Sequence, residues 1–128
     1  MIYASSAALR VVALSVLAAA LVGCGVSLST QPAPASEPSD ECNMARISGV
    51  LTRNAESGLG LRETEAFVRG VVWPFWYSAR RDPSGVVVLI DRSGQIVARE
   101  GDLLEMAGGY GNGDIAYPCF DPHLRVVR

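Results

Sequence analysis

From residue 42 onward, the chain consists of short runs of alternating apolar and polar residues separated by turn-forming residues. The runs at 45–54, 59–65 and 68–74 each predict a strand with one buried face. The run at 85–91, GVVVLID, is apolar on both faces, which is typical of a central strand. Two further strands are predicted at 95–100 and 103–108.

Turns punctuate these runs closely. Asp91-Arg92-Ser93-Gly94 places glycine where a turn needs a left-handed residue, and Gly101-Asp102 marks another turn. Five or six short strands at this spacing predict an all-β domain, a small barrel or sandwich. The nearest general architecture is OB-like, a five-stranded, partly open Greek-key barrel. The one candidate for helix is a single turn near Thr64.

The first 23 residues follow a different pattern. A positive N-terminus and Arg10 precede a mostly apolar run at 11–22, which is shorter than the roughly 20 residues that span a bilayer. This arrangement is that of a secretory signal peptide. The run ends in Leu21-Val22-Gly23-Cys24, which resembles the lipobox of bacterial membrane lipoproteins.

The resemblance implies that a peptidase cleaves before Cys24, whose sulfur carries a diacylglyceryl group through a thioether. Two acyl chains hold a protein on a bilayer, whereas one binds only marginally. The implied location is the extracytoplasmic side of the cell membrane or outer membrane. In an organism with two membranes, the family's sorting rule and Gly25 point to the outer one. The alternatives are an ordinary secretory signal with a coincidental cysteine, and a retained signal anchor.

Residues 25–41 show no apolar periodicity. Pro32, Pro34 and Pro38 oppose helix and sheet pairing, so the segment is expected to be a disordered tether. A flexible chain of this length spans on the order of 20–25 Å and would hold a domain off the membrane. The predicted organisation is a signal peptide at 1–23, a lipidated cysteine and linker at 24–41, and a β domain at 42–128.

The chain has three cysteines, an odd number, so they cannot all pair with one another. With Cys24 assigned to lipid, Cys42 opens the predicted domain and Cys119 lies near its end. Both are expected outside the reducing cytoplasm, where disulfides persist, and so small a domain benefits from a covalent link. We therefore predict a disulfide between Cys42 and Cys119, with two free thiols as the alternative.

The charge balance and the few candidate catalytic residues argue against several classes of function. Residues 42–128 hold ten arginines, ten acids and no lysine, so the domain is neutral and unsuited to general nucleic-acid binding. His123, the single histidine, is expected at the surface, and no catalytic triad can be assembled. Residues 108–113, GGYGNG, fit a loop better than a phosphate-binding motif. Asp114 and Asp121 lack a calcium-loop pattern, and the cysteines are too few and too far apart for zinc. No metal, no cofactor and no enzymatic activity are therefore expected.

One stretch, WPFWYSARR at 73–81, carries candidate binding chemistry. In an extended run, Trp73, Phe75 and Tyr77 would share one face and Trp76 would lie on the other, while Pro74 marks an edge or a break. Rings beside guanidinium groups can stack on sugar rings or hold a partner protein. The simpler alternative is that the rings fill one end of a small barrel. The candidate binding patch consists of Trp73, Trp76, Tyr77, Arg80 and Arg81.

Together these features predict a lipid-anchored envelope lipoprotein whose domain is a non-catalytic module for an envelope glycan or a small ligand. The alternative is a protein-interaction or structural subunit of a membrane-associated complex. The expected partners are the membrane, through the anchor, and either a glycan or a membrane protein. An enzyme is the third and least supported class.

Overall fold

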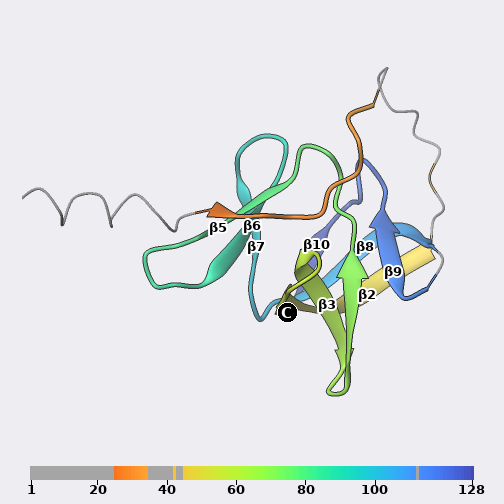
Figure 1. Cartoon of the computed structure of the whole chain (residues 1–128), viewed down its shortest axis with the longest axis horizontal. Coiled ribbons are helices and arrows are strands. Elements are labelled where there is room, and N and C mark those ends of the chain that lie inside the picture. The colour runs from red at the N-terminus through yellow and green to blue at the C-terminus, as the bar shows by residue number, and fades with distance from the viewer. Residues whose placement is uncertain (1–24, 35–41, 43–44, 112) are drawn as a thin grey trace, which may run out of the picture.

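The computed structural model of the chain describes residues 25–34, 42, 45–111 and 113–128. In this part of the chain the regular structure is entirely β, with ten strands and no helix, which confirms the predicted class (Figure 1). The strands are β1 (Gly25–Val26), β2 (Ala45–Asn54), β3 (Gly58–Thr64), β4 (Phe67–Val71), β5 (Ser78–Arg81), β6 (Val87–Ile90), β7 (Ile96–Arg99), β8 (Leu103–Tyr110), β9 (Ile115–Pro118) and β10 (Arg125–Val127).

Five of these strands form a closed barrel. β2 pairs with β3, β3 with β4, and β8 with both β2 and β9, all antiparallel. β4 and β9 run parallel, with Gly70 opposite Ile115 and Val71 opposite Ala116, and this pair closes the ring. β10 also pairs with β8. The strand order is a Greek key, in agreement with the predicted small, OB-like barrel.

The barrel interior follows from residue alternation in β2 and β8. Ile47 and Leu51 of β2 and Leu104 of β8 are completely buried. Glycine is needed where the strands approach most closely. A Cβ at Gly108 would lie 2.5 Å from Cδ1 of Ile47 and 2.6 Å from the carbonyl oxygen of Tyr117. A larger residue at 108 would therefore push β8 away from its neighbours.

A second sheet, in the order β1-β5-β6-β7, shares its core with the barrel. Its inner face contributes Ala79, Leu89 and Ala98 to a single hydrophobic cluster that also contains the barrel residues. β6 is an internal strand of this sheet, as its apolar run predicts. Turns of one design flank β6, at 82–85 and 91–94. In each turn an aspartate Oδ1 accepts bonds from the serine N–H and hydroxyl, and the glycine has φ of 88° or 84°.

Residues 25–34, which we call the strap, are bound to the domain. In β1, Gly25 pairs with Arg80 and Val26 pairs with Ala79 of β5. The expected disordered tether therefore does not hold for the strap. Among the described residues the domain begins at Gly25 and not at residue 42.

The strap continues beyond β1 through a series of backbone hydrogen bonds. The Ser29 N–H donates to the Ser57 carbonyl, the Trp73 N–H donates to the Ser29 carbonyl, and the Gln31 N–H donates to the Trp73 carbonyl. Leu28 packs against the core. Pro32 and Pro34 follow these bonds and do not interrupt them, so proline content was a misleading sign of disorder for residues 25–31.

A disulfide joins Cys42 and Cys119, as predicted, with Cα atoms 5.7 Å apart. It connects the chain just before β2 to the chain just after β9. The Cys119 N–H also donates to the Ala107 carbonyl of β8 at 3.0 Å, which holds this end of the link against the barrel. The predicted signal peptide, Cys24 and residues 35–41 lie outside the described residues.

The remaining differences from prediction are local. Strands β5, β9 and β10 were not predicted. The helical turn expected near Thr64 is absent: β3 ends at Thr64, β4 begins at Phe67, and the register shifts between Arg62 and Thr64. Residues 108–110 of the expected loop belong to β8. No helical segment of the described chain has the length and apolarity to cross a bilayer.

Candidate ligand-binding surface

The aromatic run WPFWY is broken by a turn and is not extended. The Tyr77 N–H donates to the Pro74 carbonyl at 3.0 Å, which folds the chain back between them. Trp73 and Tyr77 are buried, with 0% and 9% of their surface exposed, whereas Phe75 is 47% exposed. The condition for a shared face, an extended run, is therefore not met, and the break lies at Pro74.

Trp73 and Tyr77 stabilise the core and are not available to an external ligand. The Trp73 Nε1–H donates to the Leu59 carbonyl at 2.9 Å, and the two rings stack with centroids 6.1 Å apart. Burial raises the pKa of Tyr77 to about 12, and the negative charges of Asp91 and Asp121 add to the effect. Their assignment to a binding patch is corrected, because these two rings fill the interior.

Trp76 is half-buried, and three side chains surround its ring. The Phe120 ring centroid lies 5.5 Å away at a tilt of 46°, and Phe75 meets the ring edge-on at 6.4 Å. The Arg92 guanidinium carbon lies 4.5 Å from the centroid in cation–π geometry. We call Phe75, Trp76, Arg92 and Phe120 the ring surface.

Three separate segments build the ring surface, and each is fixed locally. Arg92 lies in the β6–β7 turn, where the Ser93 hydroxyl is the main cause that lowers the pKa of Asp91. Phe120 directly follows Cys119, so the disulfide positions its backbone. Arg92 and Phe120 did not belong to the predicted patch, and neither did Phe75, although it lies in the aromatic run. In the sequence, only the turn motif at 91–94 pointed to Arg92, and only the adjacent Cys119 pointed to Phe120.

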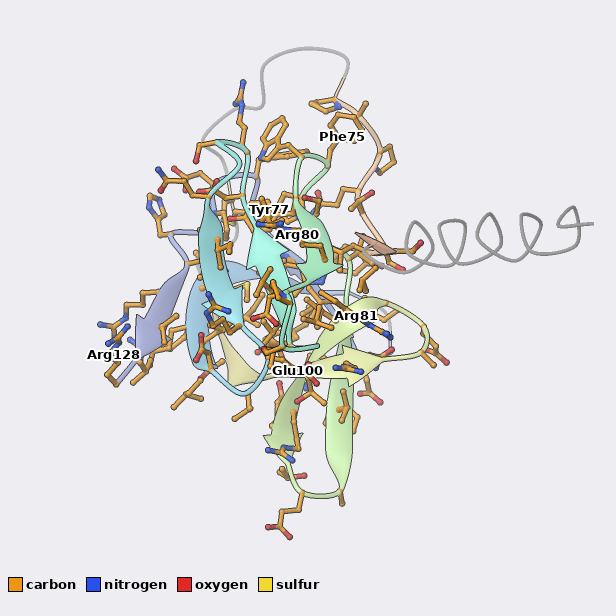
Figure 2. All side chains as sticks on the ribbon, turned by 90° about the vertical axis from the view of Figure 1, so that its left-hand side faces the viewer. Phe75, Tyr77, Arg80, Arg81, Glu100 and Arg128 are labelled. Atoms are coloured by element: carbon orange, nitrogen blue, oxygen red, sulfur yellow. A yellow bond between two sulfur atoms is a disulfide. The ribbon has the colours of Figure 1, made fainter. Side chains whose placement is uncertain are left out.

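Arg80 and Arg81 lie elsewhere, on β5. Both are exposed, and Arg81 adjoins the β5–β6 turn, whereas Arg92 lies in the turn at the opposite end of β6. Figure 2 shows this separation, with Phe75 at one end of the second sheet and Arg81 toward the other. The predicted patch thus divides into a buried pair, one ring at the ring surface, and two arginines on β5.

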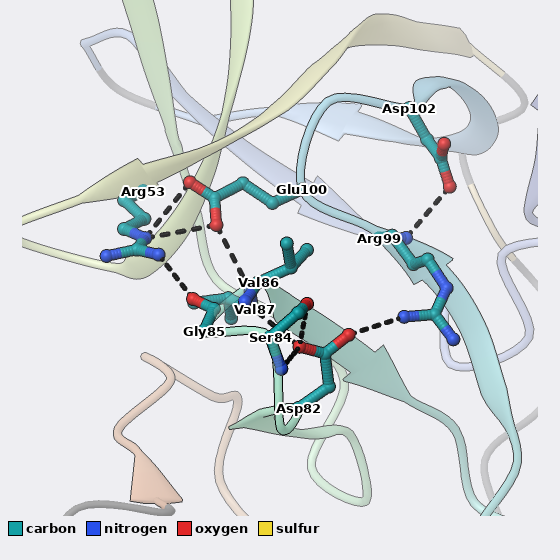
Figure 3. A network of polar contacts seen from close by, with 9 residues as sticks. All are labelled: Arg53, Asp82, Ser84, Gly85, Val86, Val87, Arg99, Glu100 and Asp102. Atoms are coloured by element: carbon teal, nitrogen blue, oxygen red, sulfur yellow. Dashed lines mark hydrogen bonds and ion pairs between the residues drawn. The ribbon is translucent and has the colours of Figure 1, made fainter.

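A polar network ties the barrel to the second sheet (Figure 3). Arg53 of β2 donates to the Glu100 carboxylate at 3.0 Å. Arg99 donates to Asp82 at 2.8 Å, and the pKa of Asp82 is lowered mainly by the Ser84 hydroxyl. Because these carboxylates already accept several bonds, the network acts as a structural clamp.

A second cluster lies at the β3–β4 hairpin. The Arg69 guanidinium lies 4.6 Å from the Tyr110 ring centroid and 5.2 Å from that of Phe67. Arg69 donates to both Glu63 oxygens at 2.6 and 2.9 Å, and this pairing lowers the pKa of Glu63. The open depression beside the cluster has a volume of about 480 Å³ and is largely charged, unlike the apolar pockets that hold small molecules. Its lining residues are Val50, Arg62, Glu63, Thr64 and Glu65.

His123 and the acidic side chains do not form a metal site in the described part of the chain. His123 is exposed, and its Nδ1 lies 3.9 Å from Asp121. Within the described ranges, no three His, Cys, Asp or Glu side chains gather as metal ligands. No protein-family model, no curated protein and no solved structure matches the chain.

Proposed function

We propose that this protein is a lipid-anchored component of a bacterial cell envelope and that its domain is a non-catalytic module that binds an envelope glycan. The binding proposal is based on the ring surface. An exposed Phe75 lies beside a half-buried Trp76, and Arg92 adds a guanidinium. Flat apolar rings match the C–H face of a sugar ring, and a guanidinium can donate to its hydroxyl or carboxylate groups.

The fixed geometry of the ring surface supports this proposal. The Pro74–Tyr77 turn bond orients Phe75 and Trp76, and the disulfide at Cys119 holds the adjoining segment. A surface that is already ordered loses less conformational entropy when it binds.

The anchor proposal rests on Leu21-Val22-Gly23-Cys24, with support from the Cys42–Cys119 disulfide, which persists in an oxidising compartment. Cys24→Ala should release the protein from the membrane fraction or leave its signal uncleaved. Mass spectrometry of the wild-type N-terminal peptide should find a diacylglyceryl group on Cys24. Unchanged attachment and processing of Cys24→Ala would contradict the anchor.

Glycan binding is tested by titrating the full chain with purified peptidoglycan fragments while tryptophan fluorescence is recorded. We expect a saturable change, and Phe75→Ala should weaken the affinity about tenfold, which corresponds to about 1.4 kcal/mol. Tyr117→Ala is the matched control, because Tyr117 is a similarly exposed ring on β9, at 41% against 47% for Phe75.

Equal affinity of Phe75→Ala and the wild type would overturn the glycan site. If no glycan saturates the protein, and mild crosslinking joins the ring surface to one membrane protein, the protein-interaction alternative replaces it.

A further inference from the structure

The second sheet has an outer face, turned away from the common core, on which Ser78, Arg80 and Ile96 are exposed. Side chains alternate along a strand, so the neighbours of the core residues Ala79 and Leu89 lie on this outer face. In β7 the register shifts, and Ile96 belongs to the outer face through its pairing with Ile90, although it lies two residues from Ala98. Cross-strand pairing arranges the outer positions in two rows. One row contains Gly25, Arg80, Val88 and Arg99, and the other contains Ser78, Ile90 and Ile96.

The composition of these rows is unusual for a sheet face that meets water, which is ordinarily polar. Val88 lies between two arginines in one row, Ile90 and Ile96 are neighbours in the other, and neither row contains an acid. Ile96 is 40% exposed, and Val88 is fully buried although it is not part of the core cluster. Arginine stems beside Val88 can cover it while their guanidinium groups reach outward.

The two arginines of the outer row differ in their partners. Arg99 donates to Asp82 at 2.8 Å. Arg80 is exposed, and within the described part of the chain it forms no ion pair. Its charge is therefore available to an anionic surface.

The strap places the proposed anchor at the edge of this face. Gly25 lies opposite Arg80 in the outer row, and one peptide bond joins Gly25 to Cys24. Consecutive Cα atoms are about 3.8 Å apart, so a lipid on Cys24 would be attached one residue from the Gly25–Arg80 pair. The strap is hydrogen-bonded from Gly25 to Gln31, so it does not act as a spacer between domain and bilayer.

We infer that the outer face of the second sheet docks on the bilayer surface, with Arg80 at anionic phospholipid headgroups and Ile96 at the interface. Basic residues near an anionic leaflet gain electrostatic attraction, and aliphatic side chains gain from leaving water. The inference rests on the proposed lipid anchor, since the anchor brings this face to the membrane.

The experiment uses the full chain, processed in a bacterial host and purified from its membranes. Mass spectrometry first establishes whether Cys24 carries the diacylglyceryl group. The protein is then placed in detergent micelles, in phosphatidylcholine vesicles, and in vesicles that also contain phosphatidylglycerol. The rate of modification of each arginine by an arginine-selective glyoxal reagent is measured in all three.

We expect Arg80 to react about fivefold more slowly in the phosphatidylglycerol vesicles than in micelles. Arg62, which is exposed on β3, should react equally in both. Ile96→Glu should return Arg80 to its rate in micelles, because it places a negative charge on the outer face. Leu103→Glu is the matched control, since Leu103 is 41% exposed and lies on β8.

The outcomes separate the two proposals. An unmodified Cys24 overturns the anchor and the docking together. A lipidated Cys24 with equal Arg80 rates in vesicles and micelles overturns the docking alone, and so does equal protection of Arg62 and Arg80. Protection of Arg80 that Ile96→Glu removes and Leu103→Glu retains supports the docked face.

Discussion

The barrel and the second sheet differ in how their strands are closed and in which faces they bury. The barrel closes on itself through the β4–β9 pair, so each of its strands has a partner on both sides. The second sheet is open, shares one face with the common core, and carries Ile90 and Ile96 on the other. The barrel thus supplies the scaffold, whereas the candidate contacts with ligand and membrane lie on the second sheet, on its turns and on the segments that lead from the barrel to them.

The largest effect should come from the ring that joins the two regions. Trp73→Ala removes a fully buried side chain and one of the two side-chain donors to the Leu59 carbonyl, the other being the Ser57 hydroxyl. We expect the free energy of unfolding to fall by about 3–5 kcal/mol, measured by urea denaturation with circular dichroism. Phe75→Ala is the control, and because Phe75 is exposed it should change stability by less than about 0.5 kcal/mol. Similar losses for the two variants would show that Trp73 does not couple the regions.

The disulfide should give the next largest effect. The double variant Cys42→Ser with Cys119→Ser removes a link that closes the chain around the whole barrel. We expect a loss of about 2–4 kcal/mol in thermal or urea unfolding, because the unfolded chain regains freedom. Cys24→Ala should match the wild type in the same measurement. An unchanged midpoint for the double variant would mean that the barrel needs no covalent closure.

The strap offers a smaller and more local test. Gln31 Nε2 donates to the Pro118 carbonyl at 2.8 Å and to the Val72 carbonyl at 3.3 Å. Gln31→Ala should cost about 1–2 kcal/mol and speed hydrogen exchange of the Trp73 N–H, which donates to the strap, more than exchange in β2. Gln95→Ala, in the β6–β7 turn, should leave both rates unchanged. Uniform acceleration would show that the strap unfolds only with the barrel.

The smallest effect concerns the hairpin ion pair of the barrel. Pairing with Arg69 lowers the pKa of Glu63 from its ordinary value of 4.5. The ion pair therefore stabilises the folded protein fully at pH values above 4.5. This stabilisation is lost as the pH falls through the lowered pKa that Glu63 has in the folded protein. Glu63→Gln should cost about 1 kcal/mol at pH 7 and nothing at pH values where Glu63 is protonated. The measurement is the melting temperature of the wild type and of Glu63→Gln as a function of pH, with Glu65→Gln as the control. A difference between the wild type and Glu63→Gln that persists in acid would contradict this origin.

Much of the fold could be predicted because the barrel strands alternate regularly. The runs at 45–54 and 103–108 coincide with β2 and most of β8. β5 could not be predicted, since three of the four residues in SARR are polar. β9 is equally short, and its pairing with β4 depends on residues distant in the sequence.

The candidate site was predictable only at its centre. Aromatic density identified Trp76, and Pro74 gave the one warning of a break in the run. Arg92 and Phe120 reach Trp76 from segments that only the folded chain brings together. Trp73, Trp76 and Tyr77 belong to the same aromatic run, so the composition of the run cannot distinguish buried rings from exposed ones. The turn between Pro74 and Tyr77 determines which rings are buried.

The strap also has a mechanical consequence. A pull applied through Gly25 would first shear the two residue pairs of β1 and then the bonds of Ser29 and Gln31. The force would then reach Cys42, whose link to Cys119 shields the barrel from further extension. Residues 25–41, fully drawn out, would give a leash of roughly 60 Å. An anchored molecule would thus lengthen under load as these bonds break in turn, up to a fixed reach, with its barrel still folded.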